Sequence, residues 1–210
     1  MSTSVRAAAV VVACAIAVTA TPAIAQTQAG PDARQARTAA ASKEPVARVM
    51  APAPAVEDIA LVDQHGRATT LREAVASDKP VLLNFIFTTC TTICPIMTAG
   101  FSQFQDRLGQ DRDRVRLVSI SIDPETDTVD VLRAYAERHG AGPNWLFFTG
   151  TSEAVEAAQR AFGAFRGDPL SHAPVTYFRR APGSAWEQLD GLPSAAALLR
   201  MYRGDRSAGH

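Results

Sequence analysis

The chain has 210 residues, of which 47% are hydrophobic and 20% charged, and its 21 basic side chains balance its 21 acidic ones. A net charge of zero, with no run of basic residues, argues against a nucleic-acid-binding protein. The length is enough for one globular domain with one core, preceded by shorter segments.

The N-terminus predicts export. Residues 1–25 begin with one basic side chain and continue as a nearly uninterrupted apolar run. Small residues at Ala23 and Ala25 match the pattern that signal peptidase reads, so we expect cleavage before Gln26. The alternative is a membrane anchor, because the same segment is just long enough to span a bilayer. In both cases the remainder is expected in an extracytoplasmic, oxidising space, which is the periplasm in a bacterium.

A linker is predicted to follow the export segment. Residues 26–55 are rich in Ala, Gln, Pro and Thr and show no periodic apolar face, which is typical of a flexible spacer. Residues 56–205 are then predicted to form a single domain, and residues 206–210 a tail.

Strand and helix signals alternate within this domain. Strands are predicted over residues 59–67, 81–87, 115–122, 145–148, 175–178 and 185–189. Helices are predicted over residues 69–76, 96–104, 128–139, 152–162 and 194–203, with Ser152 as a helix cap. A βαβ crossover followed by a strand pair and a final helix predicts an α/β fold. Its mixed sheet would be covered by helices on both faces, in a thioredoxin-like arrangement.

Two cysteines follow the buried strand at residues 81–87. Cys90 and Cys94 are separated by three residues and lie at the strand-to-helix turn, where the helix dipole favours a thiolate. The pair has three possible roles, as a redox disulfide, as ligands of one soft metal ion, or as a structural disulfide. Thioredoxin-like enzymes place two residues between their cysteines. Structural zinc needs four ligands, and Cys14 lies in the export segment. We favour a functional pair, because such a turn at the mouth of a sheet commonly carries a site.

Four segments together resemble the SCO/SenC family. They are the cysteine motif, an Asp-Pro segment, a Trp-containing strand and a histidine before a strand, at residues 87–95, 119–128, 144–150 and 172. The resemblance covers roughly residues 56–204, and the first two segments are specific in combination. It implies a thioredoxin-like fold, copper binding through two cysteines and a distant histidine, and a role in building the dinuclear copper centre of cytochrome c oxidase. The implied ligands here are Cys90, Cys94 and His172.

The chemistry of these three residues agrees with the resemblance. Thiolates are soft ligands that suit Cu(I), and imidazole suits both Cu(I) and Cu(II). Three ligands leave a position open to a ligand from a partner that accepts copper. For His172 the alternative is an ordinary loop histidine. The other candidate ligands are assigned to structural positions. His65 is assigned to a turn, His139 to a helix end, His210 to the tail and Met97 to the core.

The chain departs from the family pattern beside the histidine. The family commonly has aspartate before this histidine and Ser or Thr after it, whereas this chain has Ser171-His172-Ala173-Pro174. Ser171 is a weaker partner for orienting the imidazole than aspartate would be. Pro174 is similar to the cis proline of thiol-disulfide enzymes. Asp123 matches the family's Asp-Pro position, where it either influences the cysteine loop and the metal or forms a turn that caps the next helix.

These observations predict a copper metallochaperone with a redox-active cysteine pair rather than an ordinary enzyme. Its expected partner is the copper-accepting subunit of cytochrome c oxidase or another copper protein, and a membrane tether is possible. The alternative is an extracytoplasmic thiol-disulfide reductase that keeps a partner's cysteines reduced and needs a thiol reductant. A third hypothesis is a disulfide-stapled interaction domain. His172 separates the first two hypotheses, because disulfide exchange needs only the cysteines.

Overall fold

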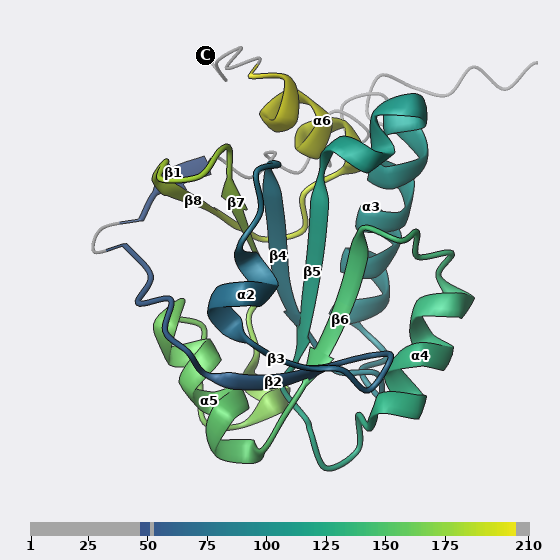
Figure 1. Cartoon of the computed structure of the whole chain (residues 1–210). Coiled ribbons are helices and arrows are strands. Elements are labelled where there is room, and N and C mark those ends of the chain that lie inside the picture. The colour runs from purple at the N-terminus through teal and green to yellow at the C-terminus, as the bar shows by residue number, and fades with distance from the viewer. Residues whose placement is uncertain (1–46, 51–52, 205–210) are drawn as a thin grey trace, which may run out of the picture. The chain divides into compact units, whose positions relative to one another are not determined.

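A mixed sheet of eight strands forms the centre of the computed structural model, which describes residues 47–50 and 53–204 (Figure 1). The strands are β1 (Ala47–Val49), β2 (Ala60–Asp63), β3 (Ala68–Thr70), β4 (Val81–Ile86), β5 (Arg116–Ser121), β6 (Trp145–Thr149), β7 (Val175–Arg179) and β8 (Trp186–Asp190). Their order in the sheet is β1-β8-β7-β4-β5-β6-β2-β3. Strands β4, β5 and β6 are parallel, and the other pairings are antiparallel.

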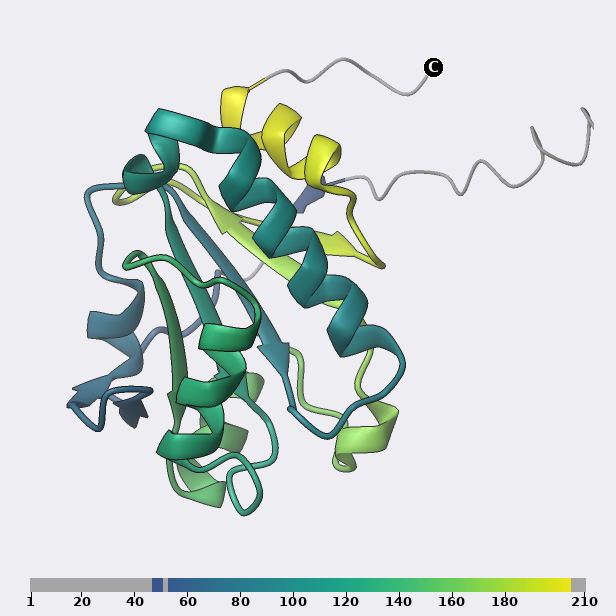
Figure 2. The same ribbon diagram turned by 90° about the vertical axis from the view of Figure 1, so that its right-hand side faces the viewer.

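Helices cover both faces of this sheet. They are α2 (Leu71–Val75), α3 (Ile93–Leu108), α4 (Val129–Arg138), α5 (Ser152–Ala161) and α6 (Ala195–Arg203), with short 3₁₀ helices η1 (Gly109–Arg114) and η2 (Pro169–Ser171). Helices α3 and α4 are successive crossovers between parallel strands, and right-handed connections put them on the same face. Figure 2 shows α6 beside α3 on that face, while α2 and α5 lie on the other. The predicted thioredoxin-like α/β fold is confirmed.

The core is built around β4. All six of its residues are buried, as expected for a central strand that has helices on both faces. The ring of Phe85 meets the rings of Phe162 and Tyr177 edge to face, each at a centroid distance of 6.1 Å. This packing fixes the strand that leads directly into the cysteine turn.

Several element boundaries differ from the prediction. Helix α3 begins at Ile93 rather than after Pro95, because a proline in the first turn removes only an N–H that has no partner within the helix. Thr151, not Ser152, caps α5 by accepting a hydrogen bond from the Ala154 N–H at 3.2 Å. Strand β3 occupies the start of the predicted helix at residues 69–76.

Strand β1 lies inside the predicted linker. Its residues pair antiparallel with β8, so the linker prediction is wrong for residues 47–49. A three-residue edge strand is held by its backbone and is too short to produce a side-chain period. The export segment, Cys14, residues 26–46 and the tail lie outside the described residues. In the described part of the chain, no helix is long and apolar enough to cross a membrane.

The sheet topology brings three loops to the same end of the sheet, the end at which β4 and β5 terminate. Because β4 and β5 are parallel, the cysteine turn and the turn after Ser121 both follow the carboxyl ends of their strands. Strand β7 runs antiparallel to β4, with Thr176 opposite Asn84, so the chain entering β7 passes the end of β4. This register places His172 at the same end of the sheet as the cysteines.

Candidate metal centre

The sulfur of Cys90 lies at the N-terminus of α3. Thr92 occupies the cap position but makes no side-chain cap hydrogen bond. Instead the Cys94 N–H donates to Cys90 Sγ at 3.4 Å, and Thr92 Oγ1 lies 3.7 Å from the same sulfur. Cys90 therefore acts as the acceptor for the first turn of α3, which begins with N–H groups that have no partner within the helix.

The two thiols differ in acidity. Burial opposes ionisation of the half-buried Cys90, but hydrogen bonds from the Cys94 and Thr92 backbone outweigh it and lower the pKa from 9.0 to about 7. Cys94 has no exposed surface, and its burial, together with the nearby Cys90 and Asp127, raises its pKa to about 12. The prediction that the helix end favours a thiolate is confirmed for Cys90 and wrong for Cys94, where burial dominates.

This asymmetry predicts selective alkylation of Cys90 by iodoacetamide. Because the thiolate is the nucleophile, the rate should rise with pH and reach half its maximum near pH 7. Cys94 should stay unmodified in the folded protein. Both cysteines fall in one tryptic peptide that ends at Arg107, so fragmentation of this peptide in the mass spectrometer assigns the modified residue at each pH. The protein unfolded in urea is the control, since both thiols should then titrate at ordinary values. A midpoint for Cys90 that does not differ from the unfolded control would contradict the assignment.

Asp127 connects the cysteine turn to β5. Its carboxylate is fully buried and accepts three kinds of hydrogen bond, from the Thr88 N–H at 3.1 Å, the Thr88 hydroxyl at 2.5 Å and the Ser121 hydroxyl at 2.6 Å. Burial raises the pKa of Asp127 above its ordinary value, although these hydrogen bonds act in the opposite direction. Asp127 was missed because the only signal for it was its place in the matched segment at residues 119–128.

Asp123, the residue singled out by the sequence, has a different position. Its backbone carbonyl accepts from the N–H groups of Thr126 and Asp127, so the predicted turn is confirmed. The cap of α4 is Thr128, whose hydroxyl accepts from the Val131 N–H at 3.4 Å. The Asp123 side chain lines a cavity instead, and its influence on the cysteine loop stays a prediction.

Removal of the Asp127 carboxylate should destabilise the fold. Asp127→Ala removes the acceptor of one buried donor, the Ser121 hydroxyl, and of two half-buried donors on Thr88. A buried unsatisfied donor costs about 1–3 kcal/mol, so we expect a loss of roughly 2 kcal/mol or more. Asp130→Ala is the matched control on α4, because this exposed carboxylate has only Arg133 as a partner, and should cost under about 1 kcal/mol. Urea denaturation measures both variants, and equal losses would show that the network does not hold the turn.

His172 is buried at the end of η2. Its side-chain Nε2 lies 3.1 Å from the Phe85 carbonyl oxygen, which can only accept, so Nε2 carries the proton and donates. Nδ1 is buried and has no hydrogen-bond partner among the described residues. Burial also lowers the pKa of the ring, which keeps it neutral. His172 thus presents an uncommitted lone pair on Nδ1, a donor atom suited to a metal ion.

The structure does not bring all three predicted ligands into one cluster. Among the described residues, no group of three His, Cys, Asp or Glu side chains is placed to hold a metal ion. Cys90 and Cys94 lie together, and His172 is hydrogen-bonded to the backbone of the strand that leads into their turn. The structural positions predicted for the other candidates are confirmed where they are described, with a turn, the end of α4 and the core for His65, His139 and Met97. His210 lies outside the described residues.

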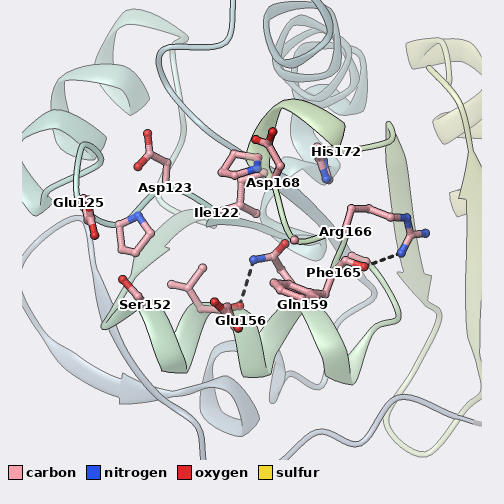
Figure 3. A pocket seen from close by; sticks show the side chains of 15 residues that line it. Ile122, Asp123, Glu125, Ser152, Glu156, Gln159, Phe165, Arg166, Asp168 and His172 are labelled. Carbon is pink, nitrogen blue, oxygen red and sulfur yellow. Dashed lines mark hydrogen bonds between the residues drawn. The ribbon is translucent and has the colours of Figure 1, made fainter.

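A cavity of about 310 Å³ lies beside His172 (Figure 3). It is bounded by α5, by the turn at residues 122–125 and by the segment at residues 164–169. The cysteines are not among its lining residues. His172 therefore lies between two features, the end of β4 on one side and this cavity on the other.

The model of the SCO1/SenC family matches residues 49–177, which is more than half of the chain. The chain belongs to the SCO1/SenC family. The match includes the cysteine turn, Asp127 and His172, and the predicted resemblance is thereby confirmed.

Individual SCO1/SenC proteins agree with this assignment. The SCO1 protein homolog of Bacillus subtilis is 36% identical over 125 residues, which are 58% of this chain and 64% of that protein. The chain thus spans less than two thirds of that relative's length. The structure of ScoI from Bradyrhizobium japonicum with copper bound is 25% identical, covers 69% of this chain and 96% of its own, and has a TM-score of 0.57.

A second SCO1/SenC structure adds a redox aspect. BsSco, described as a member of the Sco family of cytochrome c oxidase assembly proteins with a disulfide switch, is 26% identical to this chain. The alignment covers 75% of this chain and 96% of BsSco, with a TM-score of 0.61.

Proposed function

We propose that this protein binds copper through Cys90, Cys94 and His172 and serves the maturation of the dinuclear copper centre of cytochrome c oxidase. The observation that carries the proposal is the buried Nδ1 of His172, which has no hydrogen-bond partner in the part of the chain that the structure describes. A buried polar atom without a hydrogen bond is costly, and one at the same sheet edge as two thiols has a ready use as a ligand.

The donor set fits copper. With a pKa of about 7, Cys90 is about half thiolate at neutral pH, and Cys94 would give up its proton on binding, because metal ligation requires the thiolate. Two thiolates and a neutral imidazole suit Cu(I). Since the three donors are not clustered among the described residues, binding must draw them together. A set of three also leaves a position free for a ligand of the accepting protein.

The comparisons support both parts of the proposal, copper binding and a role in cytochrome c oxidase assembly. Copper is bound in the Bradyrhizobium japonicum relative, and BsSco is described as belonging to a family of cytochrome c oxidase assembly proteins. The proposed partner is therefore a copper-accepting subunit of that oxidase. The export segment predicted at residues 1–25 supports action in an extracytoplasmic space, after cleavage or with the segment kept as a membrane anchor.

One observation favours a second function, thiol-disulfide reduction. An attacking thiol needs a low pKa, and Cys90 has one, while the buried Cys94 is placed as the thiol that completes the disulfide. The reductase would use the same cysteines and would need an external thiol reductant. It would not need His172.

The His172→Ala variant separates the two functions. We expect its Cu(I) affinity to fall by about 10- to 100-fold or more, because even residues that only support a ligand cost that much. Reduction of a model disulfide should change little, since exchange proceeds through a thiolate and a mixed disulfide. Competition with a Cu(I) chelator measures affinity. The exchange rate is measured at several pH values, because the ring lies near the cysteine turn.

His65→Ala is the matched control, because His65 lies in an exposed turn between β2 and β3. It should leave both activities at the level of the parent protein. Parental copper affinity in His172→Ala would remove the histidine from the ligand set and favour the reductase.

A further inference from the structure

Negative charge predominates among the charged side chains that line the cavity beside His172. Four carboxylates line it, against a single guanidinium, that of Arg166: Asp123, Glu125, Glu156 and Asp168. Figure 3 shows these side chains around the opening, with the His172 ring at the wall. A cavity with this lining favours a cationic occupant.

Little of this charge is neutralised within the described part of the chain. Glu156 is paired with Arg160 at 3.2 Å, but the side chains of Asp123 and Glu125 make no hydrogen bond or ion pair to described residues. Asp168 accepts from the Leu170 N–H through Oδ1 alone. The carboxylates of Asp123 and Glu125 and the second carboxylate oxygen of Asp168 therefore remain available to a ligand.

Arg166 does not fill the role of counter-charge. Its Nη1 donates to the backbone carbonyls of Gly163 at 2.9 Å and Phe165 at 2.8 Å. No ion pair joins Arg166 to a carboxylate of the cavity in the described residues. The guanidinium is hydrogen-bonded to the backbone of its own loop, and it does not neutralise the carboxylates of the cavity.

The second observation is independent of the carboxylates. His172 is only 7% exposed, its Nε2–H is used by the Phe85 carbonyl, and its Nδ1 is an unpartnered acceptor. An acceptor of this kind calls for an N–H donor or a metal ion. His172 is one of the residues that line the cavity, so a buried neutral acceptor lies beside the charged ones.

We propose that this cavity receives the cationic side chain of an arginine or lysine from a docking partner. Its N–H groups would donate to His172 Nδ1 and to the carboxylates of Asp123 and Asp168. A volume of about 310 Å³ gives room for one side chain, and lies at the small end of ligand pockets. An arginine or lysine suits acceptors that are spread over the cavity wall, because its N–H groups point in several directions.

Occupation of the cavity has a consequence that rests on the proposed function. Nδ1 is the nitrogen left for copper, and one lone pair cannot accept from a partner's N–H and ligate an ion at the same time. A side chain inserted on docking would therefore compete with copper for His172. The docking step itself would loosen the hold on the ion that is to be delivered.

The first test uses N-acetyl-arginine amide as the probe on the metal-free, reduced protein. Titration followed by ¹H–¹⁵N NMR should give saturable shifts for backbone amides of residues 122–125 and 164–172 and for the His172 ring. N-acetyl-citrulline amide has nearly the same shape without the charge and should give no such shifts. Equal responses to both probes, shifts spread over the surface, or no shifts with arginine would each overturn the proposal.

Two matched double variants test which carboxylates bind the probe. Asp123→Asn with Asp168→Asn should weaken the probe at least about tenfold, since two charge-assisted hydrogen bonds are lost. Asp58→Asn with Asp130→Asn removes as much charge from exposed sites that pair with Arg72 and Arg133, and should not change binding. Equal weakening in both double variants would reduce the effect to general electrostatics and overturn the assignment.

A copper arm separates the two proposals. The arginine probe should weaken Cu(I) binding by the parent protein but not by His172→Ala. Probe binding without copper binding would overturn the proposed function and leave the cavity assigned. Probe binding that leaves the parent's copper affinity unchanged would overturn the competition for His172.

Discussion

Replacement of Cys94 by serine is expected to abolish tight copper binding. The variant keeps one thiolate and the imidazole, and a hydroxyl is a poor ligand for a soft ion. Loss of a ligand should exceed the roughly 10- to 100-fold cost of losing a residue that only supports one. Competition between the reduced protein and a Cu(I) chelator measures the affinity and the stoichiometry, which should be one ion per chain in the parent.

Two further variants make this result interpretable. Thr91→Ser changes an exposed residue of the same turn and should bind copper as the parent does. Cys94 is fully buried, so a serine there places a hydroxyl in the core, and Cys90→Ser repeats the test at a half-buried position. If either cysteine variant folds and keeps the parental affinity, the cysteine pair is not the copper site.

Mild oxidation is expected to remove copper binding completely and reversibly. Cys90 and Cys94 would form one disulfide, with two electrons and two protons passing to the oxidant, and the sulfurs would no longer be thiolates. The experiment uses the Cys14→Ser variant, so that every thiol counted belongs to the pair. Thiol counting and metal analysis on one oxidised sample should both give zero, and reduction should restore both.

The control for oxidation is the double variant Cys90→Ser with Cys94→Ser in the same background. It should bind no copper in either state, which separates the cysteine site from adventitious binding. Full copper loading in a sample without free thiols would sink the proposed ligand set.

The central strands and the topology could be predicted because burial leaves a direct trace in the sequence. Strand β4 is buried on both faces and reads as a run without charged residues at 81–86, with Asn84 as its one polar side chain. Strand β1 leaves no such trace, because its three residues are held by backbone pairing with β8. The early start of α3 was hidden by Pro95, which marks a helix boundary in most contexts but is tolerated in a first turn.

The candidate site could be located from the sequence but not resolved. The topology of a thioredoxin-like sheet places His172 near the cysteine turn, and the register of β4 and β7 agrees. The opposite acidities of the cysteines depend on the direction of two N–H groups and on the depth of Cys94, neither of which a linear pattern records. In the same way, the segment at residues 119–128 holds two aspartates, and only the fold shows that Asp127 turns inward while Asp123 lines the cavity.

The position of the Cys90 sulfur on the end of α3 ties the redox poise of the pair to the integrity of a helix. The hydrogen bonds that favour the thiolate are also the ones that satisfy the first turn, so each stabilises the other. A disulfide sulfur carries no charge and accepts these bonds weakly, and the fold therefore favours the reduced pair. A bias of this kind makes the disulfide a stronger oxidant and easier to open. In an oxidising compartment, an external thiol reductant would therefore return the protein readily to the one state in which both sulfurs can hold a metal.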